Sequence, residues 1–162
     1  GLYPAKTGGL VTDGKDVLPS QLQSYRELFA IVFTDFHLFD RLYGLEAIDE
    51  DRLGQLIHEM ELSEKTAFYE GRFSNIKLST GQRKRLALIT VLLEDKPVLI
   101  FDEWAADQDP SFRKHFYQDI LPALKAEGKT IIAATHDDHY FHAADRLLSM
   151  DEGKFIEEER PN

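Results

Sequence analysis

Two short apolar segments constrain the fold of this 162-residue chain more than any other feature. Residues 98–101 and 130–135 have the length of strands, and their largely apolar character is typical of strands buried in a parallel sheet. A helix-forming run at 110–125 lies between them and is followed by Gly128, a common helix terminator. A strand, a helix and a second strand in this order form a right-handed crossover unit. The sequence therefore predicts an α/β fold with a parallel sheet.

Local signals predict smaller elements on both sides of this unit. Asp13-Gly14 predicts a hairpin at 10–17, because this pair supplies the positive φ that a tight turn needs. The other expectations are a short apolar segment at 28–33, an aromatic loop at 34–39, a small helical region at 45–62, an irregular stretch at 71–77 and a terminal hairpin at 147–156.

A further helix is predicted to begin at Ser79. Ser79 is a favourable N-cap, Gln82 stands three residues later as in a capping box, and a helix-forming run continues to about Glu94. The N–H groups and the positive dipole end of a helix attract anions, and Gly81 would permit close approach of the backbone. The start of this helix is therefore a candidate anion-binding site.

Three cations, Arg83-Lys84-Arg85, fall in the first turn of that predicted helix, where each opposes the helix dipole. A bound anion would offset this unfavourable interaction. Alternatively, at least two of the three long side chains extend outward and interact with an acidic surface. The sequence leaves both interpretations open.

Polar residues follow both strands of the crossover unit. Asp102 and Glu103 come directly after residues 98–101, and His136 comes after residues 130–135. Ligands of open parallel sheets bind beyond the carboxyl ends of the strands, so these side chains are expected to share a site. The alternative is an acidic strand end that is merely solvated.

Composition excludes several classes of protein. A net charge of −10, from 19 Lys and Arg against 29 Asp and Glu, disfavours non-specific binding of nucleic acid. The absence of cysteine excludes disulfides and thiolate metal sites. No apolar run approaches the roughly 18 residues of a membrane-spanning helix, and no signal-peptide pattern opens the chain. We expect one soluble domain in a cytosolic setting and, because Gly1 replaces an initiator methionine, a piece of a longer protein.

The segment Leu78-Ser79-Thr80-Gly81-Gln82 resembles the Leu-Ser-Gly-Gly-Gln signature of the ATP-binding-cassette (ABC) family. The resemblance continues, in order, through a Walker B strand at 98–102, the following Glu103, a D-loop-like segment at 106–109 and the switch histidine His136. It implies a P-loop NTPase-like ABC ATPase core, made of a parallel sheet with flanking helices, and a small helical subdomain. The core would be incomplete at its N-terminal side. Residues 1–162 would form one partial domain, made of the hairpin and Q-loop-like segment (1–39), the helical subdomain with the signature helix (40–95) and the Walker B, D-loop and switch-histidine part (96–162).

Residues 33–40 and 102–110 are similar to those of bacterial cyclic-peptide and siderophore-peptide exporters of the syringomycin-exporter type. This finer resemblance implies an ATP-hydrolysing domain that powers export of a peptide-like substrate from the cytoplasmic face of the bacterial inner membrane. The implied partners are the exporter's transmembrane domain and a second ATPase copy, which would form a head-to-tail, nucleotide-dependent dimer. No nucleic-acid partner is expected.

The family resemblance also implies roles for individual residues towards ATP and Mg²⁺. Asp102 would hold Mg²⁺ through water, Glu103 would polarise the attacking water and His136 would contact the γ-phosphate, which suits the positioning that phosphoryl transfer needs. Ser79, Gly81 and Gln82 would contact ATP bound on the second subunit, and Asp109 would couple the two sites. Thr34 or Asp35 stands where the family has its Q-loop glutamine.

One family motif has no complete copy in these residues, namely the phosphate-cradling loop Gly-x-x-x-x-Gly-Lys-Ser/Thr. Residues 9–16 nearly fit, but Asp16 replaces the Mg²⁺-binding hydroxyl and the segment has the pattern of a hairpin. The chain is therefore expected to begin after this loop and to be inactive in isolation. Thr80 and Trp104 also depart from the family pattern at positions that supply no polar contact of their own.

Other interpretations remain open at this stage. The chain could belong to an ABC-type ATPase of DNA repair or chromosome maintenance, or it could be a non-catalytic interaction module that kept the fold. His136-Asp137-Asp138-His139, with His142 nearby, could alternatively bind a metal ion. The aromatic residues at 36–39 could contact the coupling helices of a membrane domain or simply pack in the core.

Overall fold

A three-stranded parallel sheet forms the centre of the computed structural model, which describes residues 7–45 and 47–161. Its strands are β3 (Phe29–Val32), β6 (Val98–Asp102) and β7 (Thr130–Ala134), in the order β3-β6-β7. The register places Ile31 beside Ile100 and Ile100 beside Ile132. The predicted parallel sheet is confirmed, and β6 lies in its middle.

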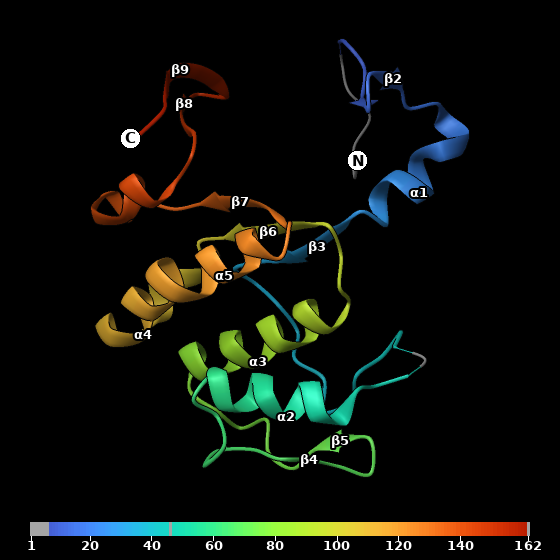
Figure 1. Cartoon of the computed structure of the whole chain (residues 1–162), viewed down its shortest axis with the longest axis vertical. Coiled ribbons are helices and arrows are strands. Elements are labelled where there is room, and N and C mark those ends of the chain that lie inside the picture. The colour runs from blue at the N-terminus through green and yellow to red at the C-terminus, as the bar shows by residue number, and fades with distance from the viewer. Residues whose placement is uncertain (1–6, 46, 162) are drawn as a thin grey trace.

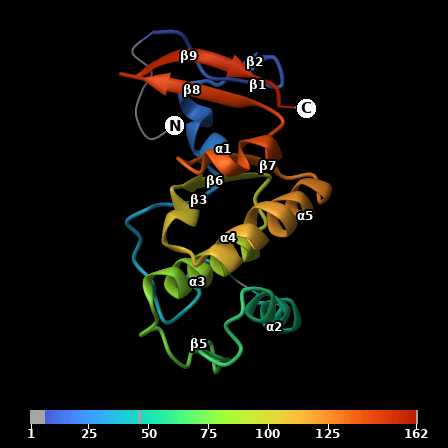
Figure 2. The same cartoon turned by 90° about the vertical axis from the view of Figure 1, so that its left-hand side faces the viewer.

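The main helices lie on one side of this sheet (Figures 1 and 2). They are α2 (Glu50–Glu59), α3 (Thr80–Leu93), α4 (Pro110–His115), the π-helical turn η3 (Phe116–Ile120) and α5 (Leu121–Ala126). Leu99 and Phe101 are buried beneath them, because alternate residues of β6 point to the helical side. The main hydrophobic core therefore lies between the sheet and one layer of helices.

The prediction of a buried strand at 130–135 is correct about the strand but wrong about its burial. β7 does form and pairs with β6, but it lies at the edge of the sheet, and Ile132 is 51% exposed. Ile132 shares a row with Ile31 and Ile100 on the face turned away from the helices. A continuous apolar run indicates a strand but cannot specify that both of its faces are covered.

The long helix predicted at 110–125 has the expected extent but not a uniform hydrogen-bonding pattern. Pro122 lacks an N–H group, and its ring would collide with the carbonyl of residue 118 in a regular α-helix. The π-helical turn at Phe116–Ile120 ends two residues before Pro122 and widens the helix where that carbonyl lies. The run is therefore continuous as α4, η3 and α5.

Short hairpins lie on both sides of the main layers. Asp13 and Gly14 both have positive φ in the β1–β2 turn, so the hairpin predicted at 10–17 is confirmed. The overlapping residues 9–16 therefore do not form a phosphate-binding loop. Residues 71–77, predicted to be irregular, include strand β5, because Glu70 and Gly71 form the turn of another hairpin. The strands of the three hairpins are β1 (Val11–Thr12) and β2 (Lys15–Asp16), β4 (Phe68–Tyr69) and β5 (Arg72–Phe73), and β8 (Leu147–Asp151) and β9 (Lys154–Glu159).

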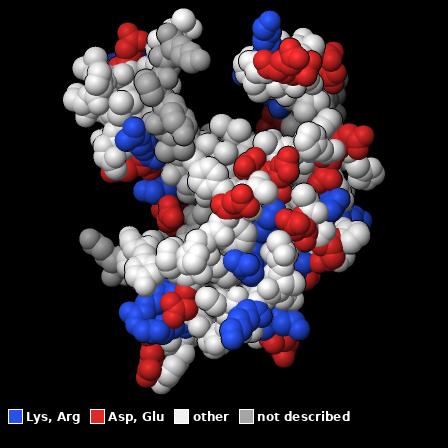
Figure 3. Space-filling view, turned by 180° about the vertical axis from the view of Figure 1, so that it is seen from behind, with Lys and Arg blue, Asp and Glu red and all other residues white. Residues whose placement is uncertain are grey.

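The β1–β2 segment and the β8–β9 hairpin project from the side of the sheet opposite the main helices, and Figure 3 shows them as separate lobes. The first lobe continues into η1 (Pro19–Gln21) and α1 (Leu22–Arg26), and the second follows η4 (Asp138–Ala143). The predicted terminal hairpin is confirmed. None of the helices in residues 7–45 and 47–161 has the length and apolar character to cross a membrane.

Candidate functional site

The carboxyl ends of the three parallel strands bring four predicted site residues to one edge of the sheet. Thr34 follows β3, and its hydroxyl lies 3.0 Å from the Asp102 carbonyl and 3.3 Å from Asp102 Oδ2. Glu103 follows β6, and its Oε1 lies 3.4 Å from Nε2 of His136, which follows β7. These distances confirm the prediction that the side chains after β6 and β7 lie close together.

Oxygen donors at this edge suit a hard cation. The Asp102 carboxylate and the Thr34 hydroxyl are adjacent, and Mg²⁺ prefers such ligands while keeping several of its waters. Asp35 lines a surface pocket of about 400 Å³ with Phe36, Thr80 and Arg83. Of the two candidates for the Q-loop position, Thr34 is the residue whose side chain contacts Asp102.

Glu103 has a left-handed backbone conformation, with φ 48° and ψ 33°. This conformation costs an ordinary residue about 1–2 kcal/mol, so neighbouring contacts must hold it. The Glu103 N–H donates to the carbonyl of Ala134 at 3.0 Å, which ties Glu103 to β7. Its carbonyl accepts from Lys84 Nζ at 3.0 Å and from the Ala106 N–H at 3.3 Å. Contacts on both sides therefore keep the backbone in the turn.

Ser79 is the N-cap of α3, as predicted. Its hydroxyl accepts from the Gln82 N–H at 3.3 Å, and Gln82 Oε1 accepts from the Ser79 N–H at 3.2 Å. The predicted capping box is confirmed. The Gln82 side chain therefore holds the start of the helix, and the Ser79 side chain is exposed at the surface.

Gly81 lies directly against the D-loop-like segment. A Cβ built on Gly81 would stand only 2.6 Å from the carbonyl oxygen of Asp107, a backbone atom that cannot easily move. Its own carbonyl accepts from Gln108 Nε2 at 3.2 Å. In this chain, the lack of a side chain at Gly81 is required for contact between α3 and residues 106–109.

Gly81→Ala is expected to lower the free energy of unfolding by about 1–3 kcal/mol, because the added methyl overpacks this contact. Gly54→Ala is the matched control, since Gly54 lies in α2 and its added Cβ meets nothing within 4 Å. This second change is expected to stabilise the chain by about 0.5–1 kcal/mol. Urea unfolding followed by the fluorescence of the single tryptophan, Trp104, measures both. Equal shifts for the two variants would contradict the close contact at Gly81.

The interpretation that at least two of the three cations at 83–85 extend outward is wrong. Lys84 is 1% exposed and Arg85 is 6% exposed. Lys84 Nζ lies 2.7 Å from Asp107 Oδ2. Arg83 is half-buried, with its guanidinium 5.6 Å from the centre of the Phe36 ring. Acidic residues far along the chain lie against α3, which the local pattern of the helix cannot reveal.

Arg85 makes the most extensive of these contacts. Its Nε donates to Gln108 Oε1 at 2.9 Å, its Nη1 to Glu61 Oε2 at 3.0 Å, and its Nη2 to Asp109 Oδ2. The guanidinium carbon also lies 3.4 Å from the centre of the Phe112 ring. Arg85 therefore fastens the signature helix to residues 108–112.

Asp109 is the N-cap of α4. Its carboxylate accepts from the Ser111 hydroxyl, the Phe112 N–H and Arg85. These contacts, the Ser111 hydrogen bond first, lower the pKa of Asp109 to about 2. Asp109 therefore stays ionised at neutral pH, and several donors of its own chain hold its side chain in place.

Two residues that the sequence did not single out link the D-loop-like segment to the region of His136. Arg113 donates to the carbonyls of Ala106 and Gln108 and, at 3.2 Å, to Asp137 Oδ1. The Tyr117 hydroxyl lies 3.2 Å from Asp137 Oδ2, and burial raises the pKa of Tyr117 to about 12. Both residues lie on the helix run after Pro110, and no sequence motif distinguishes them from ordinary helix residues.

The alternative metal site gains no geometric support. The Asp137 carboxylate is occupied by Arg113 and Tyr117, and the rings of His139 and His142 are 6.5 Å apart. Within the part of the chain that the structure describes, no three His, Asp or Glu side chains are grouped to hold a metal ion.

The comparison with known sequences decides the family. The sequence profile described as "ABC transporter" matches residues 1–106. This chain belongs to the ABC transporter family. It is 43% identical over 160 residues to the ATP-binding protein SyrD of Pseudomonas syringae pv. syringae. It is 32% identical over 171 residues to the ATP-dependent lipid A-core flippase of Vibrio parahaemolyticus. Each alignment covers 96% of this chain but only 28% of the relative.

Solved ABC structures share the fold. A bacterial Atm1-family ABC exporter with ATP bound superposes with a TM-score of 0.82 at 20% identity, over 98% of this chain and 30% of that chain. CbiO1 of Clostridium perfringens, part of an ABC transporter complex, gives 0.73 at 26% identity over 96% of this chain and 67% of that chain. The predicted fold class, an α/β ABC ATPase core, is confirmed.

Proposed function

We propose that this chain is part of the ATP-binding and ATP-hydrolysing domain of an ABC exporter. The observation that carries the proposal is the contact of Glu103 with His136, directly beside Asp102 and Thr34. A carboxylate that can accept a proton, an imidazole that can donate to phosphate and oxygen ligands for a cation lie at one sheet edge. This combination suits attack of water on a terminal phosphate.

Each of these residues has a distinct role in the proposal. Glu103 orients and polarises the attacking water through its carboxylate, and His136 donates to the γ-phosphate of the nucleotide. Asp102, with the Thr34 hydroxyl beside it, holds Mg²⁺ through water. When bound, Mg²⁺ neutralises negative charge on the phosphate oxygens. Asp109 and its contacts with α3 couple the motion of the D-loop-like segment to the signature helix.

The second half of each nucleotide site comes from another copy of the domain in this proposal. Ser79, Gly81 and Gln82 would face ATP held on the partner, which requires a head-to-tail dimer that forms with nucleotide. The exposed Ser79 hydroxyl and the start of α3 are suited to an anion at such an interface. The 162 residues contain no complete phosphate-cradling loop, so we expect no ATP hydrolysis by this chain alone.

An exposed aromatic group supports a transmembrane partner. Phe39 and Tyr43 are both exposed, and the Phe39 ring contacts the rings of His37 and Tyr43 at centroid distances of 4.5 and 5.2 Å. Leu38 is buried in the core, so only part of the 36–39 segment packs inward. The aromatic group would receive a coupling helix at the cytoplasmic face of the bacterial inner membrane.

The proposed cargo is peptide-like, because residues 33–40 and 102–110 match the peptide-exporter pattern. The test uses the intact protein in inverted membrane vesicles, with a fluorescent cyclic lipopeptide and a fluorescent glycolipid as separate probes. We expect accumulation of the lipopeptide that requires ATP and little accumulation of the glycolipid. Transport of the glycolipid alone would contradict the peptide assignment.

A further inference from the structure

Lys84 places a buried ammonium group directly beneath Glu103. The side chain extends from α3, is 1% exposed, and its Nζ lies 3.0 Å from the Glu103 carbonyl and 2.7 Å from Asp107 Oδ2. A buried ammonium is strongly unfavourable unless it is paired and hydrogen-bonded, and both conditions are met here. The Trp104 Nε1–H donates back to the Lys84 carbonyl at 3.1 Å. These two hydrogen bonds join the signature helix to the backbone of Glu103 and to the side chain of Trp104.

The backbone at Glu103 depends on such contacts. Its φ of 48° is in the left-handed region, which non-glycine residues avoid. The Glu103 N–H donates a hydrogen bond to the Ala134 carbonyl of β7, and the Glu103 carbonyl accepts one from Lys84 of α3. Since the side chain and the carbonyl leave the same short stretch of backbone, fixing the carbonyl also fixes where the carboxylate points.

We propose that Lys84 is a positioning residue for Glu103. Its ammonium, anchored by Asp107, holds the Glu103 carbonyl so that the carboxylate remains directed towards His136. Lys84 contacts neither the carboxylate of Glu103 nor the imidazole of His136 in this role. The inference rests on the proposed function, because it assumes that Glu103 polarises the attacking water.

The test measures ATP turnover by the intact protein with methionine or glutamine at position 84. Methionine keeps most of the apolar stem but removes the donor, whereas glutamine keeps an N–H donor without the charge. Small displacements of a catalytic group lower the rate of the chemical step, so Lys84→Met is expected to lower kcat by about tenfold or more. The KM for ATP is expected to stay within about twofold, and Lys84→Gln should recover part of the lost kcat.

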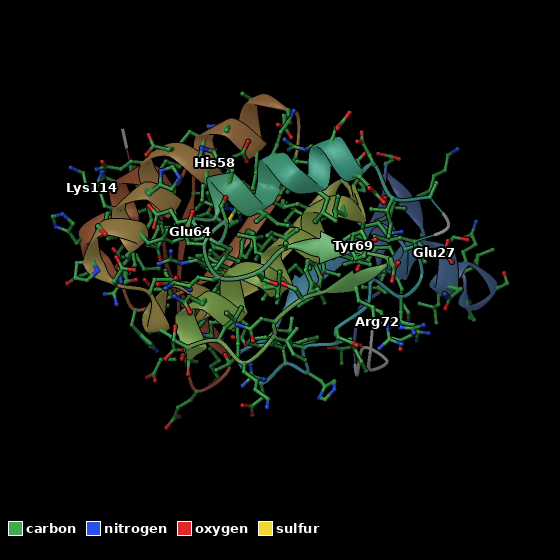
Figure 4. All side chains as sticks on the ribbon, turned by 90° about the horizontal axis from the view of Figure 1, so that it is seen from below. Glu27, His58, Glu64, Tyr69, Arg72 and Lys114 are labelled. Carbon is green, nitrogen blue, oxygen red and sulfur yellow. The ribbon has the colours of Figure 1, made fainter. Side chains whose placement is uncertain are left out.

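Lys114→Met is the matched control. Lys114 is an exposed lysine on α4, and Figure 4 shows it at the periphery, away from α3. The same chemical change there is expected to leave kcat unaltered. Trp104 fluorescence of each 162-residue variant reports whether the packing around position 84 persists, because this tryptophan is buried and contacts Lys84.

Wild-type kcat in Lys84→Met with unchanged Trp104 emission would overturn the positioning role. If Lys84→Met does not fold, Asp107→Asn serves as the test of the positioning role. Asp107 anchors the ammonium of Lys84, and its side chain is half-exposed, so the substitution leaves the core packing in place. Asp107→Asn is then expected to lower kcat with little change in KM, and wild-type kcat would overturn the proposal.

Glu103→Gln in the same assay separates the positioning role of Lys84 from the proposed function itself. If that variant retains full turnover, the proposed function fails, whereas its inactivity beside an active Lys84→Met rejects only the role of Lys84.

Discussion

Arg85→Met is expected to lower the free energy of unfolding by about 2–4 kcal/mol. The variant leaves the Oε1 of Gln108 unpaired, and Gln108 is 4% exposed, so water cannot replace the lost donor. An unsatisfied buried acceptor costs about 1–3 kcal/mol, and loss of the guanidinium from the Phe112 ring adds about 0.5–2 kcal/mol. Glu61 and Asp109 contribute less, because both carboxylates are exposed enough to be solvated again.

Arg72→Met provides the control for this prediction. Arg72 pairs with Asp40 at 3.1 Å, but both side chains are largely exposed, so the pair is expected to contribute less than about 1 kcal/mol. Urea unfolding monitored at Trp104 compares the midpoints of the two variants at constant slope. A midpoint for Arg85→Met as close to wild type as that of Arg72→Met would contradict the structural role of Arg85.

The parts of the fold that the sequence predicts well are those with local physical causes. Asp13-Gly14 determines a hairpin turn because both residues have positive φ there, and Ser79 with Gln82 determines a helix start because each caps the other. The strand ends at Asp102 and His136 were placed correctly because parallel neighbours carry their carboxyl ends to the same edge.

The features that the sequence does not predict depend on contacts between distant segments. Lys84 and Arg85 look like surface cations on α3, but carboxylates from residues 107 and 109 neutralise them in the interior. The sequence predicts close approach of the backbone at Gly81, but it does not show that this glycine lies against the backbone carbonyl of Asp107. β7 was expected to be buried, but its burial depends on what lies next to the sheet and not on its own composition.

The candidate site shows the same division. Motif spacing predicts Asp102, Glu103 and His136 as site residues, because this prediction uses only the type and order of the residues. It cannot identify Lys84, Arg113 or Tyr117, whose importance arises from the backbone and side-chain groups that they contact. The division into segments 1–39, 40–95 and 96–162 and the catalytic roles of the named residues remain predictions.

Glu103→Gln is expected to have the largest effect on activity. Glutamine has nearly the same shape and can still contact His136, but its amide is a far weaker proton acceptor than a carboxylate. Loss of a positioned general base lowers rates by about 10²–10⁴-fold. Binding of ATP is expected to persist, because the role proposed for the Glu103 carboxylate is towards water and not towards the nucleotide. Glu64→Gln, in an exposed loop near α2, makes the same chemical change outside the site and should retain full turnover.

The most direct test is phosphate release by the intact protein at saturating ATP, with nucleotide binding measured on the same samples. We expect turnover in wild type and in Glu64→Gln, and a loss of at least about 100-fold in Glu103→Gln with ATP still bound. Turnover by Glu103→Gln at the wild-type rate would contradict the assignment of this sheet edge as the hydrolytic site.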